Sequence, residues 1–205
     1  MLIGGVLLAA LVGGYLASTS KQQGSATKVS GTAQAGEFRY AVGTPGIGAD
    51  APLFTRSSTA GTNFNLDSLR GKNVLLYFQE GVGCQPCWDQ LKDIEKEWPQ
   101  FKAAGVDEMV TITVDPVSAL KRKQQLEGLK TALLSDEGLA VSRMYGTNKY
   151  GMMSTSFDGH SFILVGADGK IRWRADYGGA PDYIMFVPVP NLLADMKRDL
   201  RAAKP

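Results

Sequence analysis

The stretch VLLYFQEGVGCQPCWDQL, residues 74–91, combines three features that decide the fold. Val74–Phe78 is a continuous apolar run, which is typical of a strand buried on both faces, as in a parallel sheet. A glycine-containing loop follows, and a helical pattern starts near Pro86. The stretch therefore predicts a buried strand, a short loop and a helix. The only two cysteines of the chain, Cys84 and Cys87, fall where the loop meets the helix.

The predicted helix has a clear apolar face. Apolar residues recur after the loop at spacings of four, three, four and three, which places them on one side of a helix. Pro86 falls in the first turn, where a missing N–H costs nothing, whereas Pro99 predicts a kink or a restart of the helix. The residues of this face are Cys87, Leu91, Ile94, Trp98 and Phe101.

The spacing of the cysteines suits redox chemistry. Residues three apart in a helix have Cβ atoms about 5–6 Å apart, and a disulfide needs about 3.5–4.5 Å, so a slight tightening of the first turn joins them. The free N–H groups and the dipole at a helix N-terminus favour a thiolate. We therefore predict Cys84, at the tip, as the catalytic nucleophile. Cys87, one turn inside on the packed face, is the predicted resolving thiol.

Other roles for the two cysteines are less favoured. A disulfide that closes so short a loop stabilises a protein little. A zinc site needs four ligands, whereas the chain has two cysteines and one histidine. Of the neighbouring residues, Glu80 is interpreted as an exposed loop carboxylate, with proton transfer to Cys87 through a water as the alternative. Trp88 is either a substrate-facing or a packed aromatic residue.

The rest of the chain supplies the partners of the first strand. Strands are predicted at residues 109–114 and 161–165, and the turn at residues 167–169 leads into a hairpin strand at 170–174. A strand–helix–strand crossover implies parallel strands, and the hairpin adds an antiparallel edge. We therefore predict an α/β fold with a mixed central sheet and helices on both faces, the arrangement of the thioredoxin fold. The remaining helices are predicted at residues 117–128, at 136–145 and on the apolar stripe Leu192, Leu193, Met196 and Leu200.

The N-terminal region differs from the rest. Residues 2–17 are apolar and uncharged, and as a helix they span roughly 24 Å at about 1.5 Å per residue, slightly less than a bilayer core. Residues 1–17 are expected to be a signal peptide or, preferably, a membrane anchor. Residues 18–48, rich in small and polar residues, are the predicted flexible linker, in which residues 38–42 can pack on the domain. The predicted thioredoxin-like domain covers residues 49–205.

The N-terminal run and the charge of the chain limit where the protein is expected to work and which partners it is expected to bind. Both an anchor and a cleaved signal place the domain outside the cytoplasm, where disulfides persist. The net charge is only +2 and no basic block is present, so nucleic acid is not an expected partner. No glycine-rich phosphate loop is present, and we expect no organic cofactor.

Several blocks of the sequence, in order, resemble the redoxin family, the alkyl hydroperoxide reductase and thiol-specific antioxidant proteins of the thioredoxin fold. The resemblance covers about residues 46–176 and implies a thiol-dependent antioxidant or thiol–disulfide exchange enzyme. It implies an external thiol electron donor and either a protein disulfide or a hydroperoxide as substrate. The blocks are GADAPLFT, SLRGKNVLLYFQEGVGCQPCWDQLKDIEK, VTITVDP, LLSDEGLAVSRMYG and SFILVGADGKIRWR.

Two departures from the family leave the substrate open. Peroxiredoxins carry the pattern Pro-x-x-x-Thr/Ser-x-x-Cys, which fits neither cysteine, since Gly81 and Tyr77 precede Cys84 at these positions. Thioredoxin-like reductases carry a proline before the strand that faces the active site. Here His160 precedes that strand.

The single histidine opens an alternative function. His160 lies where a loop of this fold approaches the cysteines, and copper chaperones of the Sco type resemble this layout. Thiolate and imidazole ligands suit copper. The alternative is thus a copper carrier that uses Cys84, Cys87 and His160, although Sco proteins normally have three residues between their cysteines, and two stand between them here.

Overall fold

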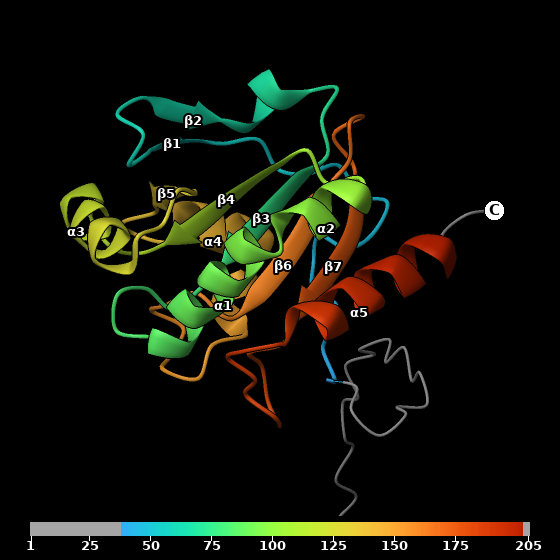
Figure 1. The fold of residues 1–205 in the computed structure, drawn as a ribbon. Coiled ribbons are helices and arrows are strands. Elements are labelled where there is room, and N and C mark those ends of the chain that lie inside the picture. Colours follow the sequence, from blue (N-terminus) through green and yellow to red (C-terminus); the bar gives the residue numbers. More distant parts are fainter. Residues whose placement is uncertain (1–37, 203–205) are drawn as a thin grey trace, which may run out of the picture. The chain divides into compact units, whose positions relative to one another are not determined.

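The computed structural model describes residues 38–202 and is built around a five-stranded sheet (Figure 1). The strand order is β5-β4-β3-β6-β7. The first three of these strands are parallel, and β6 runs antiparallel to both β3 and β7. The predicted mixed sheet of a thioredoxin-like α/β fold is confirmed. The strands are β3 Val74–Phe78, β4 Glu108–Thr113, β5 Ala132–Ser135, β6 Ser161–Val165 and β7 Ile171–Asp176.

Helices cover both faces of this sheet. In Figure 1, α1, α2 and α5 lie in front of the sheet and α4 lies behind it. The predicted interruption at Pro99 is present, because α1 ends before Glu97 and a second helix starts with Pro99 in its first turn. The helices are α1 Gln85–Lys96, α2 Trp98–Ala103, α3 Val117–Glu127, α4 Ala140–Tyr145 and α5 Val189–Ala202.

The central strand β3 serves two hydrophobic cores. Its side chains alternate between the faces of the sheet, as the period of a strand requires. Leu75 and Tyr77 pack with apolar residues of α1, α2, α3 and α5. Leu76 and Phe78 pack with residues of α4 and of the segment before β3. Burial on both faces explains the continuous apolar run in the sequence.

Two local elements differ from the prediction. Strand β5 was not predicted, and it lies at one edge of the sheet beside β4. The helix predicted to start at residue 136 begins only at Ala140. The reason is that the buried Asp136 carboxylate accepts hydrogen bonds from the N–H groups of Val141 and Ser142, so that this residue precedes the helix and binds its first turn.

Both edges of the sheet are covered by chain that precedes β3. Residues 58 and 59 bond to the β5 edge, next to a small hairpin of β1 Thr55–Ser57 and β2 Asn63–Asn65. Residues 41–50 run along β7, with hydrogen bonds between the backbones of Ala41 and Asp176 and of residues 48–49 and Ile171.

The chain is therefore packed on the domain from its first described residues. Phe38 and Tyr40 contact the main core, and the Tyr40 and Tyr177 rings lie 5.0 Å apart. Residues 38–48, which composition assigns to the linker, thus belong to the folded domain. The predicted anchor at residues 1–17 and the rest of the linker lie outside the described residues. Within residues 38–202, no helix is both long and apolar enough to cross a membrane.

Candidate active site

The two cysteines lie at the N-terminus of α1, just beyond the end of β3. Cys84 is the residue that precedes the helix and Cys87 lies in its first turn, with Pro86 between them. The two sulfur atoms form a disulfide, and the Cα atoms are 5.4 Å apart. Cys87 is fully buried, whereas Cys84 keeps 7% of its surface exposed. The structure thus places the two predicted residues together and leaves Cys84 as the more accessible one.

The loop before Cys84 has a conformation that needs glycine. Gly81 has a φ of +98°, and a Cβ atom there would lie 2.1 Å from the Asp115 carboxylate. That carboxylate accepts hydrogen bonds from the N–H of Val82 and the hydroxyl of Thr113, at 2.8 and 2.7 Å. The Gly81 carbonyl accepts a 3.0 Å bond from the indole N–H of Trp88. The end of β4 and the helix therefore fix the loop from two sides.

These contacts also settle the position of Trp88. The side chain is fully buried, in the main core. It is a packed aromatic residue rather than part of a surface that faces a substrate.

Glu80 is buried, with 3% of its surface exposed, and so differs from the expected loop carboxylate. Its Oε1 atom accepts hydrogen bonds from the backbone N–H groups of Met152 and Met153, at 2.6 and 3.1 Å. A carboxylate that accepts N–H bonds in this way stabilises the loop that supplies them. Glu80 therefore fastens a distant loop beside the cysteine-bearing loop. The sequence contains no signal for this contact, which joins residues 72 positions apart.

A buried chain of polar groups connects the sheet to the first turn of α1. The Tyr77 hydroxyl donates to the Cys87 carbonyl at 3.1 Å and contacts His160 Nδ1, also at 3.1 Å. Burial lowers the pKa of His160 to about 3, so the imidazole is neutral at neutral pH. Burial, together with the charge of Glu80, raises the pKa of Tyr77 well above 10. Both groups are therefore uncharged, and the Tyr77 hydroxyl links His160 to the Cys87 carbonyl.

The copper alternative finds no support in this arrangement. Among residues 38–202, no group of three His, Cys, Asp or Glu side chains is arranged to hold a metal ion. His160 is fully buried, and it reaches α1 through the Tyr77 hydroxyl. Its position near the cysteines is thus explained by its contact with Tyr77, which in turn bonds to the first turn of α1.

A polar network holds the outer side of the α1 tip against α3. Lys123 donates to the side chains of Gln85 and Glu127, and its ammonium lies 5.5 Å from the centre of the Trp88 ring. Hydrogen bonds from Lys123 and Lys92 lower the pKa of Glu127 to about 2. The network fixes the residue between Cys84 and Pro86 and joins the start of α1 to α3.

The disulfide is covered by a segment that sequence reasoning missed. Met185 packs against Cys84 and Cys87 and is itself only 8% exposed. It belongs to residues 178–188, called the covering segment below, which lead from β7 to α5. The available signal was the apolar run at residues 184–187, which lies between Pro181 and Pro188. An apolar run in a connection indicates a segment that packs on the domain.

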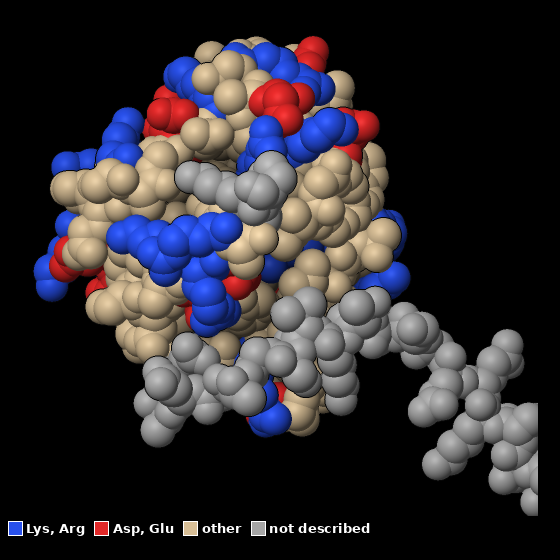
Figure 2. Space-filling view, turned by 90° about the vertical axis from the view of Figure 1, so that its right-hand side faces the viewer, with Lys and Arg blue, Asp and Glu red and all other residues tan. Residues whose placement is uncertain are grey.

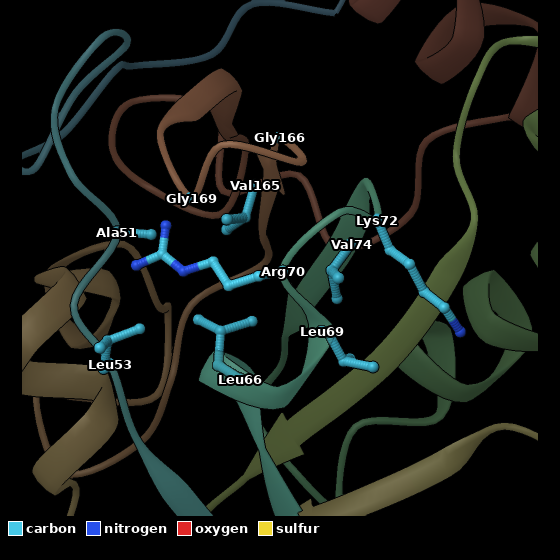
Figure 3. A pocket seen from close by; sticks show the side chains of 10 residues that line it. All are labelled: Ala51, Leu53, Leu66, Leu69, Arg70, Lys72, Val74, Val165, Gly166 and Gly169. Atoms are coloured by element: carbon cyan, nitrogen blue, oxygen red, sulfur yellow. The ribbon is translucent and has the colours of Figure 1, made fainter.

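Two pockets of the domain lie away from the cysteines. One is a cavity of about 10 Å³ between Val74, Val165 and Arg70, at the opposite end of β3 (Figure 3). Such a volume suits at most a single water molecule. A groove of about 550 Å³ runs beside α5, with Arg172, Lys197 and others at its border. Figure 2 shows basic side chains gathered over this face. Neither pocket includes a cysteine.

Comparisons with known proteins show which proteins this chain resembles. A profile of the AhpC/TSA family matches residues 47–174. The chain is 33% identical over 125 residues to the peroxiredoxin Bcp of Escherichia coli strain K12, covering 60% of this chain and 80% of that protein. It is 32% identical over 126 residues to the thiol-disulfide oxidoreductase ResA of Bacillus thuringiensis, covering 61% and 66%.

Solved structures show the same fold. Peroxidoxin BcpB from Mycobacterium tuberculosis matches with a TM-score of 0.60 at 20% identity, over 78% of this chain and 98% of that one. AhpC of Enterococcus faecalis matches with a TM-score of 0.63 at 15% identity, over 77% and 93%.

Proposed function

Because this chain belongs to the AhpC/TSA family and is a thiol-dependent oxidoreductase, we propose that Cys84 is its nucleophile and Cys87 its resolving thiol. The main support is their position at the N-terminus of α1, where the helix dipole and free N–H groups favour a thiolate at Cys84. Cys87 is fully buried and therefore reacts best with a sulfur already bound to Cys84.

Thiol–disulfide exchange is the first candidate reaction. The Cys84 thiolate attacks one sulfur of a substrate disulfide, and the other sulfur leaves as a thiolate that takes up a proton. Cys87 then loses its proton and attacks the Cys84 sulfur of the mixed disulfide. This step releases the second substrate thiol and forms the Cys84–Cys87 disulfide. An external dithiol reduces that disulfide and is itself oxidised.

Hydroperoxide reduction is the second candidate, supported by the peroxiredoxin relative, of which the chain covers 80%. Here the Cys84 thiolate attacks the terminal peroxide oxygen, which gives a sulfenic acid and releases an alcohol or water. The Cys87 thiol condenses with the sulfenic acid, and water leaves. Both reactions end in the same disulfide and need the same external thiol donor.

The experiment measures the reduction of a protein disulfide and of cumene hydroperoxide by the wild type and by the Cys84→Ser and Cys87→Ser variants. We expect Cys84→Ser to abolish turnover of both substrates. Cys87→Ser should accumulate a mixed disulfide with a protein disulfide substrate, or a sulfenic acid with cumene hydroperoxide, each visible by mass spectrometry. Wild-type rates for Cys84→Ser would overturn the assignment of the nucleophile.

We also propose that the domain works outside the cytoplasm and is anchored by residues 1–17. The supporting observation is the uncharged apolar run at residues 2–17. Alkaline phosphatase fused after residue 205 should be active in a bacterial host, because its disulfides form only after export. A matched fusion that starts at residue 18 should be inactive. Equal activity of the two fusions would contradict the proposal.

A further inference from the structure

We propose that Met185 determines which thiol donors reach Cys84, by covering the disulfide against large partners while small thiols pass. This inference rests on the proposed function, because it concerns reduction of the Cys84–Cys87 disulfide. It names a residue that lies outside the cysteine motif, in a segment about 100 positions later in the sequence.

The first observation is the contact itself. Cys84, Cys87 and Met185 form a buried apolar cluster of their own, separate from the two cores of the sheet. The exposed fractions are 7% for Cys84 and 8% for Met185. A thiolate that reduces the disulfide must contact the Cys84 sulfur. A small thiol needs only a narrow opening for this contact, whereas a protein thiol arrives with the surface that surrounds it.

The second observation is how the covering segment is held. The N–H of Val187 donates a 2.6 Å hydrogen bond to the side-chain oxygen of Gln90, a buried residue of α1 one turn after Cys87. On the other side of Met185, the N–H of Ile184 donates a 3.1 Å bond to the carbonyl of Tyr177. Two bonds thus hold Met185 over the disulfide from both sides, and one of them comes from the cysteine-bearing helix.

The third observation is the character of these attachments. The segment has no regular secondary structure and contributes no strand to the sheet. Val187 is fully buried in the main core, and Ile184 packs against that core. Asp182 makes an exposed ion pair with Arg39, a type of pair that contributes little. The segment can therefore move without breaking the sheet, although this movement takes Ile184 and Val187 away from the main core. The flexible methionine side chain can itself turn aside for a small molecule.

Small and large donors then reduce the disulfide by the same chemical steps, but they react with different forms of the protein. One thiolate of the donor attacks the Cys84 sulfur, the disulfide breaks, and Cys87 leaves as a thiolate that takes up a proton. The second donor thiol loses its proton and attacks the mixed disulfide, which frees Cys84 and leaves the donor oxidised. Small donors react with the covered form. Protein donors react with the fraction of molecules in which the segment has moved, so their apparent rate falls by that fraction.

The experiment measures reduction of the oxidised full-length protein by dithiothreitol and by reduced thioredoxin. The Met185→Ala variant should react about tenfold faster than the wild type with thioredoxin, and no more than about twofold faster with dithiothreitol. Met144→Ala is the matched control, because Met144 is an exposed methionine of α4 that has no contact with the disulfide. It should leave both rates unchanged. Equal acceleration by both donors, or no acceleration, would overturn the proposal.

Two further variants keep the test decisive if Met185→Ala does not fold. Met185→Leu retains an apolar cover and should keep the wild-type ratio of the two rates. Gln90→Ala removes the acceptor of the Val187 N–H and should raise the thioredoxin rate selectively. A wild type without turnover of any substrate would refute the proposed function. An active wild type with unchanged rate ratios in the Met185→Ala and Gln90→Ala variants would refute only the role of Met185.

Discussion

The two ends of the central sheet differ in how their polar side chains are hydrogen-bonded. At the end away from the cysteines, Asn73 joins three loops. Its N–H donates to Asp107, its side-chain N–H donates to the Gly105 carbonyl, and its side-chain oxygen accepts from the Ala167 N–H. At the cysteine end, several buried side chains have a polar atom without a hydrogen-bond partner among the described residues. They are Gln79, Gln90, Asp158, His160 and Ser161.

The difference has a physical meaning. A buried polar atom without a partner costs about 1–3 kcal/mol, so a protein rarely keeps several of them in one place. Only one further buried side chain in the described part of the chain, Thr111, has such an atom. The buried polar atoms without a partner among the described residues are thus concentrated at the cysteine end. Such a concentration is typical of functional sites, where polar groups are positioned for chemistry rather than for stability.

Two matched glycines give the strongest test of this contrast. Gly81 and Gly71 both have φ near +90°, but only at Gly81 would a Cβ atom meet another group, the Asp115 carboxylate. We expect Gly71→Ala to lower the free energy of unfolding by about 1 kcal/mol, from backbone strain alone. Gly81→Ala should lower it by about 3 kcal/mol, because the hydrogen bonds of Asp115 to Val82 and Thr113 are also disturbed. Urea denaturation of both variants measures the difference.

The same two variants should differ in reactivity. Gly81→Ala shifts the loop that leads into Cys84, so its disulfide should be reduced by dithiothreitol at a changed rate. Gly71→Ala should keep the wild-type rate. Equal losses of stability and equal rates in the two variants would mean that the two ends are built alike.

The second test uses the pH dependence of Asp158. Burial raises the pKa of this carboxyl from 3.8 to about 8 in the folded protein. The folded state therefore holds a proton that the unfolded state releases. This stabilisation is complete below the ordinary pKa and is lost as the pH rises through about 8.

Asp158→Asn removes this titration and should be more stable than the wild type at high pH. The gap in unfolding free energy should widen by about 2 kcal/mol or more between about pH 4 and pH 8, since each unit of pKa difference corresponds to about 1.4 kcal/mol. Urea denaturation of both proteins across this pH range measures the gap. A gap that stays constant with pH would show that Asp158 is ionised in the folded protein.

Tyr77→Phe removes a hydrogen-bonding hydroxyl from the cysteine end. His160 would then lose the partner of its Nδ1 atom, and its Nε2 atom already has none among the described residues. We expect a loss of about 1–2 kcal/mol in unfolding free energy. Asn73→Ala at the opposite end is the comparison, and its loss should be the smaller one, because water reaches the exposed bonds that it breaks. The reverse order of the two losses would contradict the contrast.

The smallest effect is expected from the ion pair between Lys72 and Glu108, at the end away from the cysteines. Both side chains are about half exposed, with their charged atoms 2.9 Å apart. An exposed pair contributes about 0–1 kcal/mol and is screened by salt. Lys72→Ala should therefore leave the unfolding free energy almost unchanged, and the change should be smaller still in 1 M salt. A larger, salt-insensitive loss would mean that this end also depends on charged groups.

Much of the fold follows from local sequence patterns. Val74–Phe78 and Ser161–Val165 are continuous apolar runs, and the structure has strands with the same bounds. The helix after Cys84 and its interruption near Pro99 follow from periodicity and from the properties of proline. Strand β5 was missed because its four residues lie between two helical patterns. Its strand character depends on pairing with β4, and no local pattern contains that pairing.

The two cysteines of the candidate site were predicted from the sequence, but the residues that surround them were not. Cys84 and Cys87 carry a local signal, since their spacing and the helix after them are visible in the sequence. The burial of Glu80 and the cover over the disulfide depend on contacts with Met152 and Met185, which lie far along the chain. Such contacts depend on tertiary packing, and a spacing pattern along the sequence contains no information about it.

The covered edges of the sheet have a consequence for association between molecules. A free edge strand exposes backbone groups that can pair with another chain, which leads to fibres and swapped dimers. Here residues 41–50 occupy the β7 edge, and residues 58 and 59 occupy the β5 edge. Any two copies that meet edge to edge must first displace these segments. The residues ahead of β3 thus also protect the protein against aggregation.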